Sequence, residues 1–193
     1  MRVLRSLRPV QGAPPEAVSI GFVETWIGRV YVVVSRGDVT LVSLVDEPEI
    51  LEGARSNSTD PVLREALRQL DEYFRGSRRS FVLPVRPVGT PFQLRVWRAS
   101  SAIRYGETRT YAEVARSIGV PSGARAVGSA LSANPLPVLI PCHRVVRSDG
   151  GAGGYSPHPR LKVMLLRFEA ENAGKEWSTG TGRSSASIRS MRS

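Results

Sequence analysis

The sequence has few of the residues that form covalent cross-links or bind metals. Its 193 residues include one cysteine, Cys142, and two histidines, His143 and His158. A single cysteine excludes an internal disulfide framework and an all-cysteine zinc site. With only two histidines, a zinc site built from cysteine and histidine is not expected either. We therefore predict that the chain holds no structural metal and needs no cofactor.

Long apolar runs are also missing. The chain has no run of about 18 apolar residues, so we expect no membrane-spanning helix. Its N-terminus lacks the apolar segment of a secretory signal, and the predicted location is the cytoplasm, or the nucleoid of a prokaryotic cell. Hydrophobic residues make up 41% and charged residues 23% of the chain, which excludes wholesale disorder and is typical of a globular protein.

Lysine is scarce, and arginine supplies nearly all of the positive charge. Lys162 and Lys175 are the two lysines among 27 basic residues, and 17 acidic residues leave a formal net charge of +10. Residues 1–87 carry 12 basic and 11 acidic side chains, residues 88–171 carry 11 and 5, and residues 172–193 carry 4 and 1. The basic second half indicates a polyanionic partner, most simply nucleic acid. The alternative is a charge that only keeps the protein in solution.

The first part of the chain is predicted to form a small α/β domain over residues 1–87. Asp60-Pro61 is typical of a helix start, because the side chain caps the helix and proline suits its first position. Apolar residues then recur at helical spacing until Gly76. A short strand is expected over residues 81–87. Runs rich in Val, Ile, Tyr and Thr predict three further strands, over residues 18–25, 28–35 and 39–45.

The second part, residues 88–171, is predicted to be mainly helical. Capping boxes that begin at Thr90 and Thr110 indicate two helix starts. After the second helix come a short turn with glycine and a helix over residues 123–132, capped by Ser122. Two short helices joined by such a turn are typical of a helix-turn-helix. The remaining segments are predicted as a last helix over residues 161–170 and a flexible basic tail over residues 172–193.

The helix over residues 123–132 has mostly small side chains and one long cation, Arg125. Small residues let a backbone approach something bulky, and the cation would then point at a polyanion. This pattern favours a nucleic-acid interface. The alternative is a helix packed tightly in a core, with Arg125 merely solvated.

The dipeptide Cys142-His143 lies within an apolar segment. A cysteine in such a segment is most often a small buried hydrophobic residue. Beside a histidine it can instead be a reactive thiolate, because the imidazole can take its proton. Adjacent side chains of an extended strand point to opposite faces, so the pair needs a turn, which Pro141 could provide. Both readings stay open on these residues alone.

A longer motif contains this dipeptide. Pro141-Cys142-His143-Arg144-Val145-Val146 resembles the active-site signature of the O6-alkylguanine-DNA alkyltransferases, and the resemblance runs from about Thr90 to Glu169 nearly without gaps. It implies a small ribonuclease-H-like α/β N-terminal domain, followed by a mainly helical, winged-helix-like (helix-turn-helix) DNA-binding domain. Other matching blocks are Thr90-Pro91-Phe92-Gln93, Tyr105-Gly106-Glu107-Thr108, Thr110-Tyr111, Ala124-Arg125-Ala126-Val127-Gly128, Asn134-Pro135 and Gly154-Tyr155-Ser156.

The resemblance implies irreversible transfer of an alkyl group from O6 of a flipped guanine to Cys142. His143 would act as the base through a water, and Glu169 would orient its imidazole. Tyr111 would donate a proton to the departing guanine and help to rotate the nucleotide. Without the resemblance, Tyr111 would be read as a core aromatic residue.

The resemblance also implies how DNA is held. Arg125 would fill the space left by the flipped base, and the helix face around it would approach the minor groove of alkylated double-stranded DNA, independently of sequence and as a monomer. The other implied DNA contacts are Thr110, Tyr111, Ala126 and Gly128. The implied pocket consists of Asn134 as a hinge, Pro137 and Tyr155 as walls, Ser156 as a donor to O6, and the carbonyls of Cys142 and Val145 as acceptors for the exocyclic amine.

One departure from the family pattern follows the pocket loop. Pro157-His158-Pro159 stands where many relatives have glycines, and the prolines stiffen this loop and remove backbone donors. The range of alkyl groups that the pocket accepts is therefore open. Three other functions stay possible on the sequence: a non-catalytic lesion sensor of the same fold, a winged-helix regulator with a structural thiol, and a Cys-His hydrolase.

Overall fold

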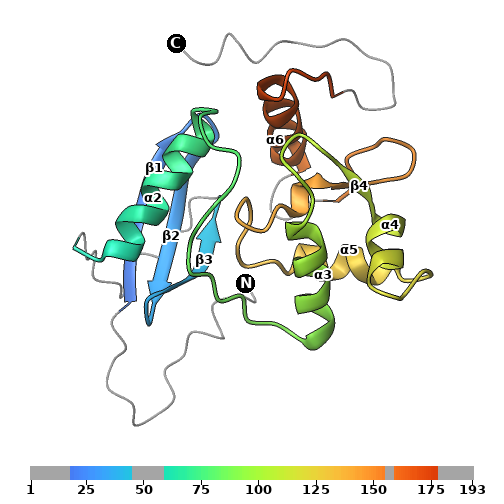
Figure 1. Cartoon of the computed structure of the whole chain (residues 1–193), viewed down its shortest axis with the longest axis horizontal. Coiled ribbons are helices and arrows are strands. Elements are labelled where there is room, and N and C mark those ends of the chain that lie inside the picture. Colours follow the sequence, from blue (N-terminus) through green and yellow to red (C-terminus); the bar gives the residue numbers. More distant parts are fainter. Residues whose placement is uncertain (1–17, 45–58, 155–158, 178–193) are drawn as a thin grey trace.

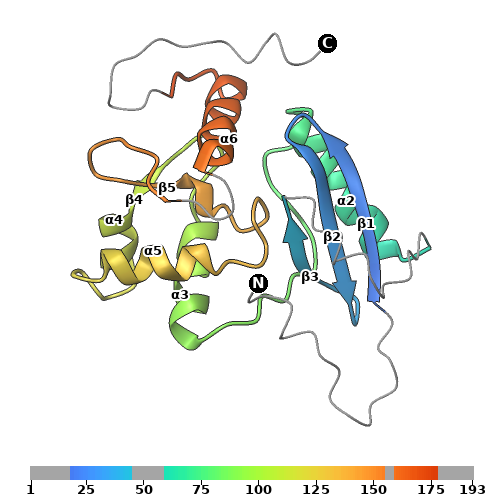
Figure 2. The same ribbon diagram turned by 180° about the vertical axis from the view of Figure 1, so that it is seen from behind.

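The computed structural model describes residues 18–44, 59–154 and 159–177. It contains a small sheet covered by one helix and, beside it, a mainly helical unit (Figures 1 and 2). The first unit has the element order β1, β2, β3, α2, and the second has α3, β4, α4, α5, a 3-10 turn η2, β5 and α6. None of the helices in these ranges is long and apolar enough to cross a membrane.

The sheet consists of three antiparallel strands in the order β1-β2-β3. The β2–β3 hairpin turns at Arg36 and Gly37, whose φ angles are 55° and 77°. Two successive positive φ angles give the turn that suits the twist of a hairpin. The strands are β1 (Val18–Thr25), β2 (Gly28–Ser35) and β3 (Asp38–Ser43). The three predicted strands are confirmed, although the last ends at Ser43 and the predicted end at Val45 lies outside the described residues.

Helix α2 (Pro61–Phe74) covers the sheet. Asp60 caps it, accepting hydrogen bonds from the backbone amides of Val62 and Leu63 at 2.9 and 3.1 Å, as predicted. The buried face of α2 and alternate valines of β2 share one hydrophobic core. The residues of α2 in this core are Leu63, Ala66, Leu70, Tyr73 and Phe74.

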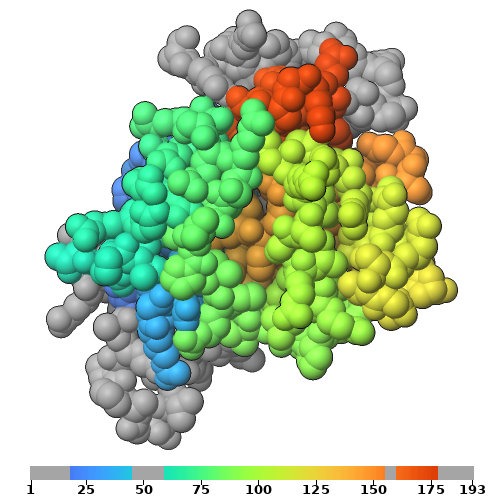
Figure 3. All heavy atoms as spheres, in the orientation of Figure 1, coloured from blue at the N-terminus to red at the C-terminus, as the bar shows by residue number. Residues whose placement is uncertain are grey.

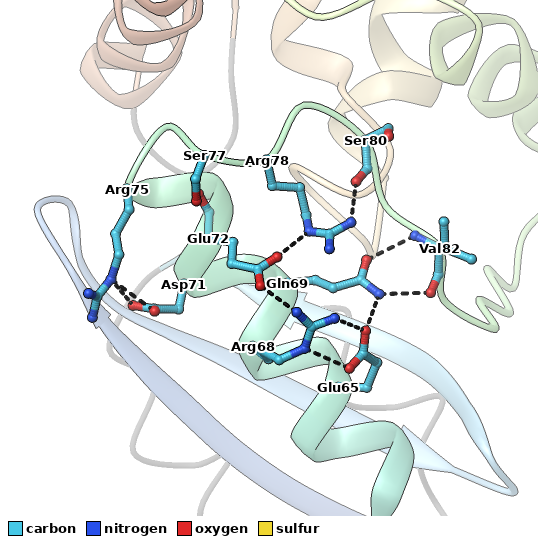
Figure 4. Close-up of polar contacts among 10 residues, drawn as sticks. All are labelled: Glu65, Arg68, Gln69, Asp71, Glu72, Arg75, Ser77, Arg78, Ser80 and Val82. Atoms are coloured by element: carbon cyan, nitrogen blue, oxygen red, sulfur yellow. Dashed lines mark hydrogen bonds and ion pairs between the residues drawn. The ribbon is translucent and has the colours of Figure 1, made fainter.

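The predicted strand over residues 81–87 is wrong. The segment makes one isolated bridge to β3, with Val39 N–H donating to Pro84 O at 2.8 Å and Arg86 N–H donating to Val39 O at 3.0 Å. Pro84 and Pro87 have no amide to donate, so a continuous ladder cannot form. The chain is held to α2 instead: the Gln69 side chain donates to and accepts from the backbone of Val82, both at 2.9 Å (Figure 4).

The second unit begins with α3 (Pro91–Ser101) and the helix pair α4 (Tyr111–Ser117) and α5 (Ala124–Ser132). Both predicted capping boxes, Thr90 with Gln93 and Thr110 with Glu113, are present. The predicted cap at Ser122 is wrong, because Gly123 occupies the N-cap position without a side-chain bond. Gly123 N–H closes a turn onto Val120 O at 2.7 Å, so the helix starts one residue later.

Two short parallel strands and a last helix complete the second unit. The turn η2 (Cys142–Arg144) lies directly before β5 (Val145–Val146), which pairs with β4 (Arg109–Thr110). Helix α6 (Pro159–Asn172) is longer at both ends than the predicted 161–170. The predicted start of the tail at residue 172 is wrong, because Asn172 is the last residue of α6; residues 178–193 of the predicted tail lie outside the described residues.

Helix α6 joins the two units. Its Phe168 is fully buried, and its ring centroid lies 5.1 Å from that of Trp26 and 5.7 Å from that of Tyr73, both in the first unit. A single buried cluster extends from the sheet through α2 to α3, α5 and α6. The space-filling view shows the two units in direct contact, with α6 in red at one end (Figure 3). The side chains that α6 carries are therefore placed by both units.

Candidate active site

The single thiol lies in a turn held by an asparagine. Cys142 begins η2 and is 5% exposed, and its Sγ accepts a hydrogen bond from Asn134 Nδ2 at 3.2 Å. Asn134 also donates to Ile140 O at 2.9 Å and accepts from the amide of Leu136 at 3.0 Å. The same side chain therefore fixes both ends of the loop that leads to the cysteine. The turn that an adjacent Cys–His pair requires is present.

The same loop contains an unusual backbone conformation. Val138 is buried and has a φ of 73°. A β-branched residue rarely adopts this region, and holding it there costs about 1–3 kcal/mol. The loop before Cys142 is thus kept in a defined shape by packing and by the hydrogen bonds of Asn134.

His143 follows Cys142 in the turn η2 and is fully buried. Its Nε2 lies 2.9 Å from Oε1 of Glu169, and its Nδ1 has no hydrogen-bond partner among the described residues. Burial lowers the pKa of His143, with Arg144 and Lys162 acting in the same direction and Glu169 opposing them. A neutral imidazole that donates from Nε2 to Glu169 leaves Nδ1 as an acceptor. In that form, Nδ1 is a buried ring nitrogen that can accept a proton, on the residue that follows Cys142.

Glu169 collects five hydrogen bonds. Its Oε1 accepts from Tyr73 Oη at 2.7 Å, from His143 Nε2 at 2.9 Å and from Arg144 Nη2 at 2.9 Å. Its Oε2 accepts from Arg144 Nε at 2.9 Å and from the amide of Gly106 at 3.1 Å. Burial raises the pKa of Glu169, but the charges and hydrogen bonds of His143 and Arg144 outweigh it and hold the pKa well below its usual value. The carboxylate is therefore ionised and fixed in orientation.

Tyr111 opens α4 and meets a buried lysine. Lys162 is 1% exposed, and its Nζ donates to Tyr111 Oη at 3.1 Å and to Val145 O at 2.6 Å. Tyr111 Oη in turn donates to Gly154 O at 3.3 Å. Burial lowers the pKa of Lys162 to about 8, against the opposing charge of Cys142. Burial, and then the charge of Cys142, raise the pKa of Tyr111, so its hydroxyl keeps a proton that it can donate.

The helix pair α4–α5 exposes the predicted DNA-facing residues unequally. Arg125 and Ala126 are exposed on the first turn of α5, and Gly128 is half-buried. A Cβ on Gly128 would lie 3.7 Å from the Tyr111 ring, so α5 passes close to this aromatic residue. The Thr110 hydroxyl is engaged in capping α4, where it accepts from the Glu113 amide at 3.2 Å.

The predicted pocket residues are partly described. Pro137 is half-buried and pairs with Ile140 in an isolated bridge. The carbonyl of Val145 already accepts from Lys162, which leaves one lone pair for another donor. Tyr155 and Ser156 lie outside the described residues. Within the described ranges, no group of three or more His, Cys, Asp or Glu side chains could hold a metal ion.

The sequence analysis assigned no function to three residues around Cys142, His143 and Glu169: Lys162, Tyr73 and Arg144. A signal existed for Lys162, because a chain with 27 basic residues uses lysine at only two positions, and one of them lies in the last helix among apolar residues. Arg144 was part of the matched motif, but its partner is remote in sequence. Nothing in the sequence pattern links Tyr73 to Glu169, because the contact exists only after the two units pack.

Comparison with known proteins finds the same family of relatives along most of the chain. The model of the "6-O-methylguanine DNA methyltransferase, DNA binding domain" matches residues 91–171, and that of the corresponding "ribonuclease-like domain" matches residues 19–87. A methylated-DNA–protein-cysteine methyltransferase of Methanosarcina barkeri is 52% identical over 109 residues, covering 56% of this chain and 69% of the relative. The constitutive enzyme of Bacillus subtilis is 40% identical over 152 residues, covering 76% and 92%.

Solved structures agree with these matches. The crystal structure of Mycobacterium tuberculosis O6-methylguanine methyltransferase superposes with a TM-score of 0.73 at 34% identity, covering 80% of this chain and 94% of that one. The structure of Mycobacterium tuberculosis OGT in complex with DNA gives a TM-score of 0.72 at 33% identity over the same shares. The fold is thus the two-domain architecture of a small N-terminal domain and a C-terminal DNA-binding domain. The chain belongs to the family of the methylated-DNA–protein-cysteine methyltransferases.

Proposed function

We propose that this protein repairs O6-alkylguanine in duplex DNA by transferring the alkyl group, irreversibly and once per molecule, to Cys142. One observation carries the proposal: the single cysteine of a family named for a protein-cysteine acceptor is followed by a fully buried histidine, whose Nε2 lies 2.9 Å from the carboxylate of Glu169. A buried His–Glu pair next to a thiol is the arrangement that activates a cysteine nucleophile.

The reaction is a displacement at the alkyl carbon. His143 takes the thiol proton through a water at Nδ1, and the sulfur of Cys142 attacks. The carbon–sulfur bond forms as the bond to O6 breaks, and the electron pair stays on guanine. A proton from Tyr111 neutralises the departing base. Solvent then restores the proton of Tyr111 and removes the one that His143 gained, so Cys142 is left as a thioether.

Lys162 assists the proton donor in this proposal. Its ammonium donates to Tyr111 Oη at 3.1 Å, so the phenolate that forms when Tyr111 gives up its proton has a cation beside it. The buried position of Lys162 strengthens this effect, because water screens the charge poorly there. Glu169, fixed by five hydrogen bonds, holds the imidazole of His143 in one orientation.

DNA would bind along the helix pair α4–α5, as a winged-helix-like domain. Arg125 would fill the gap left by a flipped base, and its exposure at the start of α5 supports this role. Ala126 and Gly128 offer a small surface for close approach to the minor groove. Thr110 and Tyr111 complete the contact at the start of α4. Binding through the backbone and groove shape would be independent of sequence, and a monomer would suffice.

The base would enter the space beside Asn134, Pro137 and Val145, with Tyr155 and Ser156 completing the pocket. The first domain, 1–87, would be ribonuclease-H-like, the DNA-binding domain would extend from residue 88 to the end of α6, and the chain after α6 would form a basic tail. Because the substrate is genomic DNA, a cytoplasmic or nucleoid location belongs to the same proposal.

Intact mass spectrometry tests the proposal. The protein is incubated with duplex DNA containing a single O6-methylguanine, alongside Cys142→Ser. We expect a gain of one methyl group per chain at Cys142, loss of O6-methylguanine from the DNA, and neither change in the variant. An unchanged mass with retained DNA binding would contradict the proposal and indicate a lesion sensor or regulator. Repeated turnover with no retained label would indicate a hydrolase.

A further inference from the structure

The N-terminal domain reaches the active-site cluster through one hydroxyl. Tyr73, on the last turn of α2, is fully buried and donates from Oη to Glu169 Oε1 at 2.7 Å. The same oxygen accepts from His143 Nε2 at 2.9 Å. Tyrosine and histidine therefore share one acceptor atom, although they belong to different domains.

Several contacts fix the position of this hydroxyl. The Tyr73 ring packs against Phe168 of α6, with centroids 5.7 Å apart, and against Tyr105, with centroids 5.9 Å apart. Arg79 Nη2 donates to the carbonyl of Asn172 at the end of α6, at 2.8 Å. A Cβ on Gly76 would lie 2.7 Å from the side chain of Asn172. The end of α2 and the chain after it are thus in close contact with the helix that carries Glu169.

A polar network also stiffens the segment that makes these contacts. Arg78 Nε donates to Glu72 Oε2 at 2.7 Å, and Nη1 donates to the carbonyl of Ser80 at 2.9 Å (Figure 4). The amides of Ser77 and Arg78 both donate to the carbonyl of Glu72, at 2.9 and 3.2 Å. With the two bonds between Gln69 and Val82, the chain that leaves α2 is fixed on both sides of Arg79.

We propose that Tyr73 is a positioning residue through which the N-terminal domain sets the proton affinity of the catalytic histidine. The inference rests on the proposed function of His143 and Glu169. A hydroxyl that donates to Oε1 withdraws negative charge from the atom that His143 faces. Without it, the carboxylate would stabilise the imidazolium form more strongly, and the pKa of His143 would rise.

The titratable and charged side chains that face His143 and Glu169 come from four parts of the chain. His143 faces Glu169 and Lys162 from α6, and Arg144 from its own turn. Glu169 also faces Tyr73 from α2 and Tyr105 from the segment after α3. Burial raises the pKa of Tyr73 well above its usual value, with Glu169 adding to the effect, so its hydroxyl stays a donor across the accessible pH range.

The variant Tyr73→Phe removes this donor and keeps the ring. The matched control is Tyr105→Phe, which removes another mostly buried hydroxyl from the same aromatic cluster, one that makes no hydrogen bond to Glu169. Both are made in a Cys142→Ser, His158→Gln background, where His143 is the single histidine and no thiol titration is coupled to it. Thermal unfolding establishes that each protein is folded.

Proton NMR of the His143 ring as a function of pH is the first readout. We expect the midpoint in Tyr73→Phe to lie about one unit above that of the parent, the size expected for losing one hydrogen bond to a carboxylate. We expect no change in Tyr105→Phe. An unchanged or absent His143 titration in folded Tyr73→Phe would overturn the inference, and so would an equal shift in Tyr105→Phe.

The pH dependence of methyl transfer is the second readout, measured with Cys142 present. A higher pKa of His143 moves the acid limb of the rate profile to higher pH, because the base must be neutral to accept the thiol proton. A purely structural role would lower stability without moving this limb, and an unmoved limb would overturn the inference. If the wild-type protein transfers no methyl group, the proposed function is contradicted instead. The NMR readout still tests the role of Tyr73 in that case, because it needs no DNA.

Discussion

At the residue scale, the proposed chemistry depends on buried charges that neutralise one another. Glu169 faces two cationic or proton-donating partners on the Cys142 turn, His143 and Arg144, and Lys162 of the same helix donates to Tyr111. Each buried charge has hydrogen-bond partners, which is the condition for keeping a charge inside a protein. If one partner is removed, the remaining buried group cannot replace the lost hydrogen bond with one to water.

Lys162→Met removes the ammonium and preserves most of the apolar stem. We expect methyl transfer to slow about tenfold or more, the effect of losing a hydrogen bond from a charged group to Tyr111, the proposed proton donor. Single-turnover kinetics on a methylated duplex measure this. The matched control is Lys175→Met, which changes the other lysine, an exposed one. Equal rates in the two variants would contradict the role given to Lys162.

The lowered pKa of Lys162 leads us to expect that the stability of the protein depends on pH. Its pKa is about 8 in the folded protein and 10.5 in a model chain. Between these values the unfolded chain binds the proton more readily than the folded one, so the free energy of unfolding rises with pH, by about 3 kcal/mol over the whole range. Below pH 8 that contribution is absent. Denaturant unfolding at pH 8 and pH 10 measures the rise, which should vanish in Lys162→Met.

At the element scale, the proposed DNA contacts lie on the helix pair α4–α5, and the proposed thiol chemistry lies on the turn η2 and helix α6. Arg125 lies on α5 and makes none of the hydrogen bonds described around Cys142. We expect Arg125→Ala to slow repair of a methylated duplex at least tenfold and to leave the reaction of Cys142 with iodoacetamide unchanged. Equal losses in both assays would mean that the residue supports the fold rather than the DNA.

The small face of α5 gives a second prediction at this scale. Gly128→Ala is tolerated sterically, because the added Cβ meets the Tyr111 ring at 3.7 Å. Alanine in a helix interior stabilises by about 0.5–1 kcal/mol over glycine, so the thermal unfolding midpoint should rise. If this face touches DNA, affinity for duplex should fall at the same time. Unchanged affinity would place the DNA contact elsewhere.

Patterns of a few neighbouring residues predicted most helices and strands. They failed where proline prevents strand pairing or where a contact depends on the packing of distant segments. The capping boxes at Thr90 and Thr110 and the glycine at the β2–β3 turn act within a few residues, so the sequence contains them completely. The segment 81–87 has the composition of a strand, but its prolines limit the ladder to one bridge. The approach of Tyr73 to Glu169 spans 96 residues, and no periodicity encodes it.

At the scale of the whole molecule, the net charge predicts how the affinity for DNA depends on salt. The formal net charge of +10 is concentrated after residue 87. We expect affinity for duplex DNA to fall on the order of 10²–10³ between 50 and 200 mM salt, as for about five phosphate contacts. Fluorescence anisotropy at several salt concentrations measures the slope. An affinity independent of salt would contradict an interface based on phosphate contacts.

The burial of Lys162 has a practical consequence for labelling. The chain has two lysines, and the fold hides one and exposes Lys175 just beyond α6. An amine-reactive dye or surface linker cannot reach the buried amine of Lys162 in the folded protein, whereas the amine of Lys175 is exposed. Lys175 therefore offers a single side-chain attachment point, through which the folded protein can be immobilised with its thiol untouched.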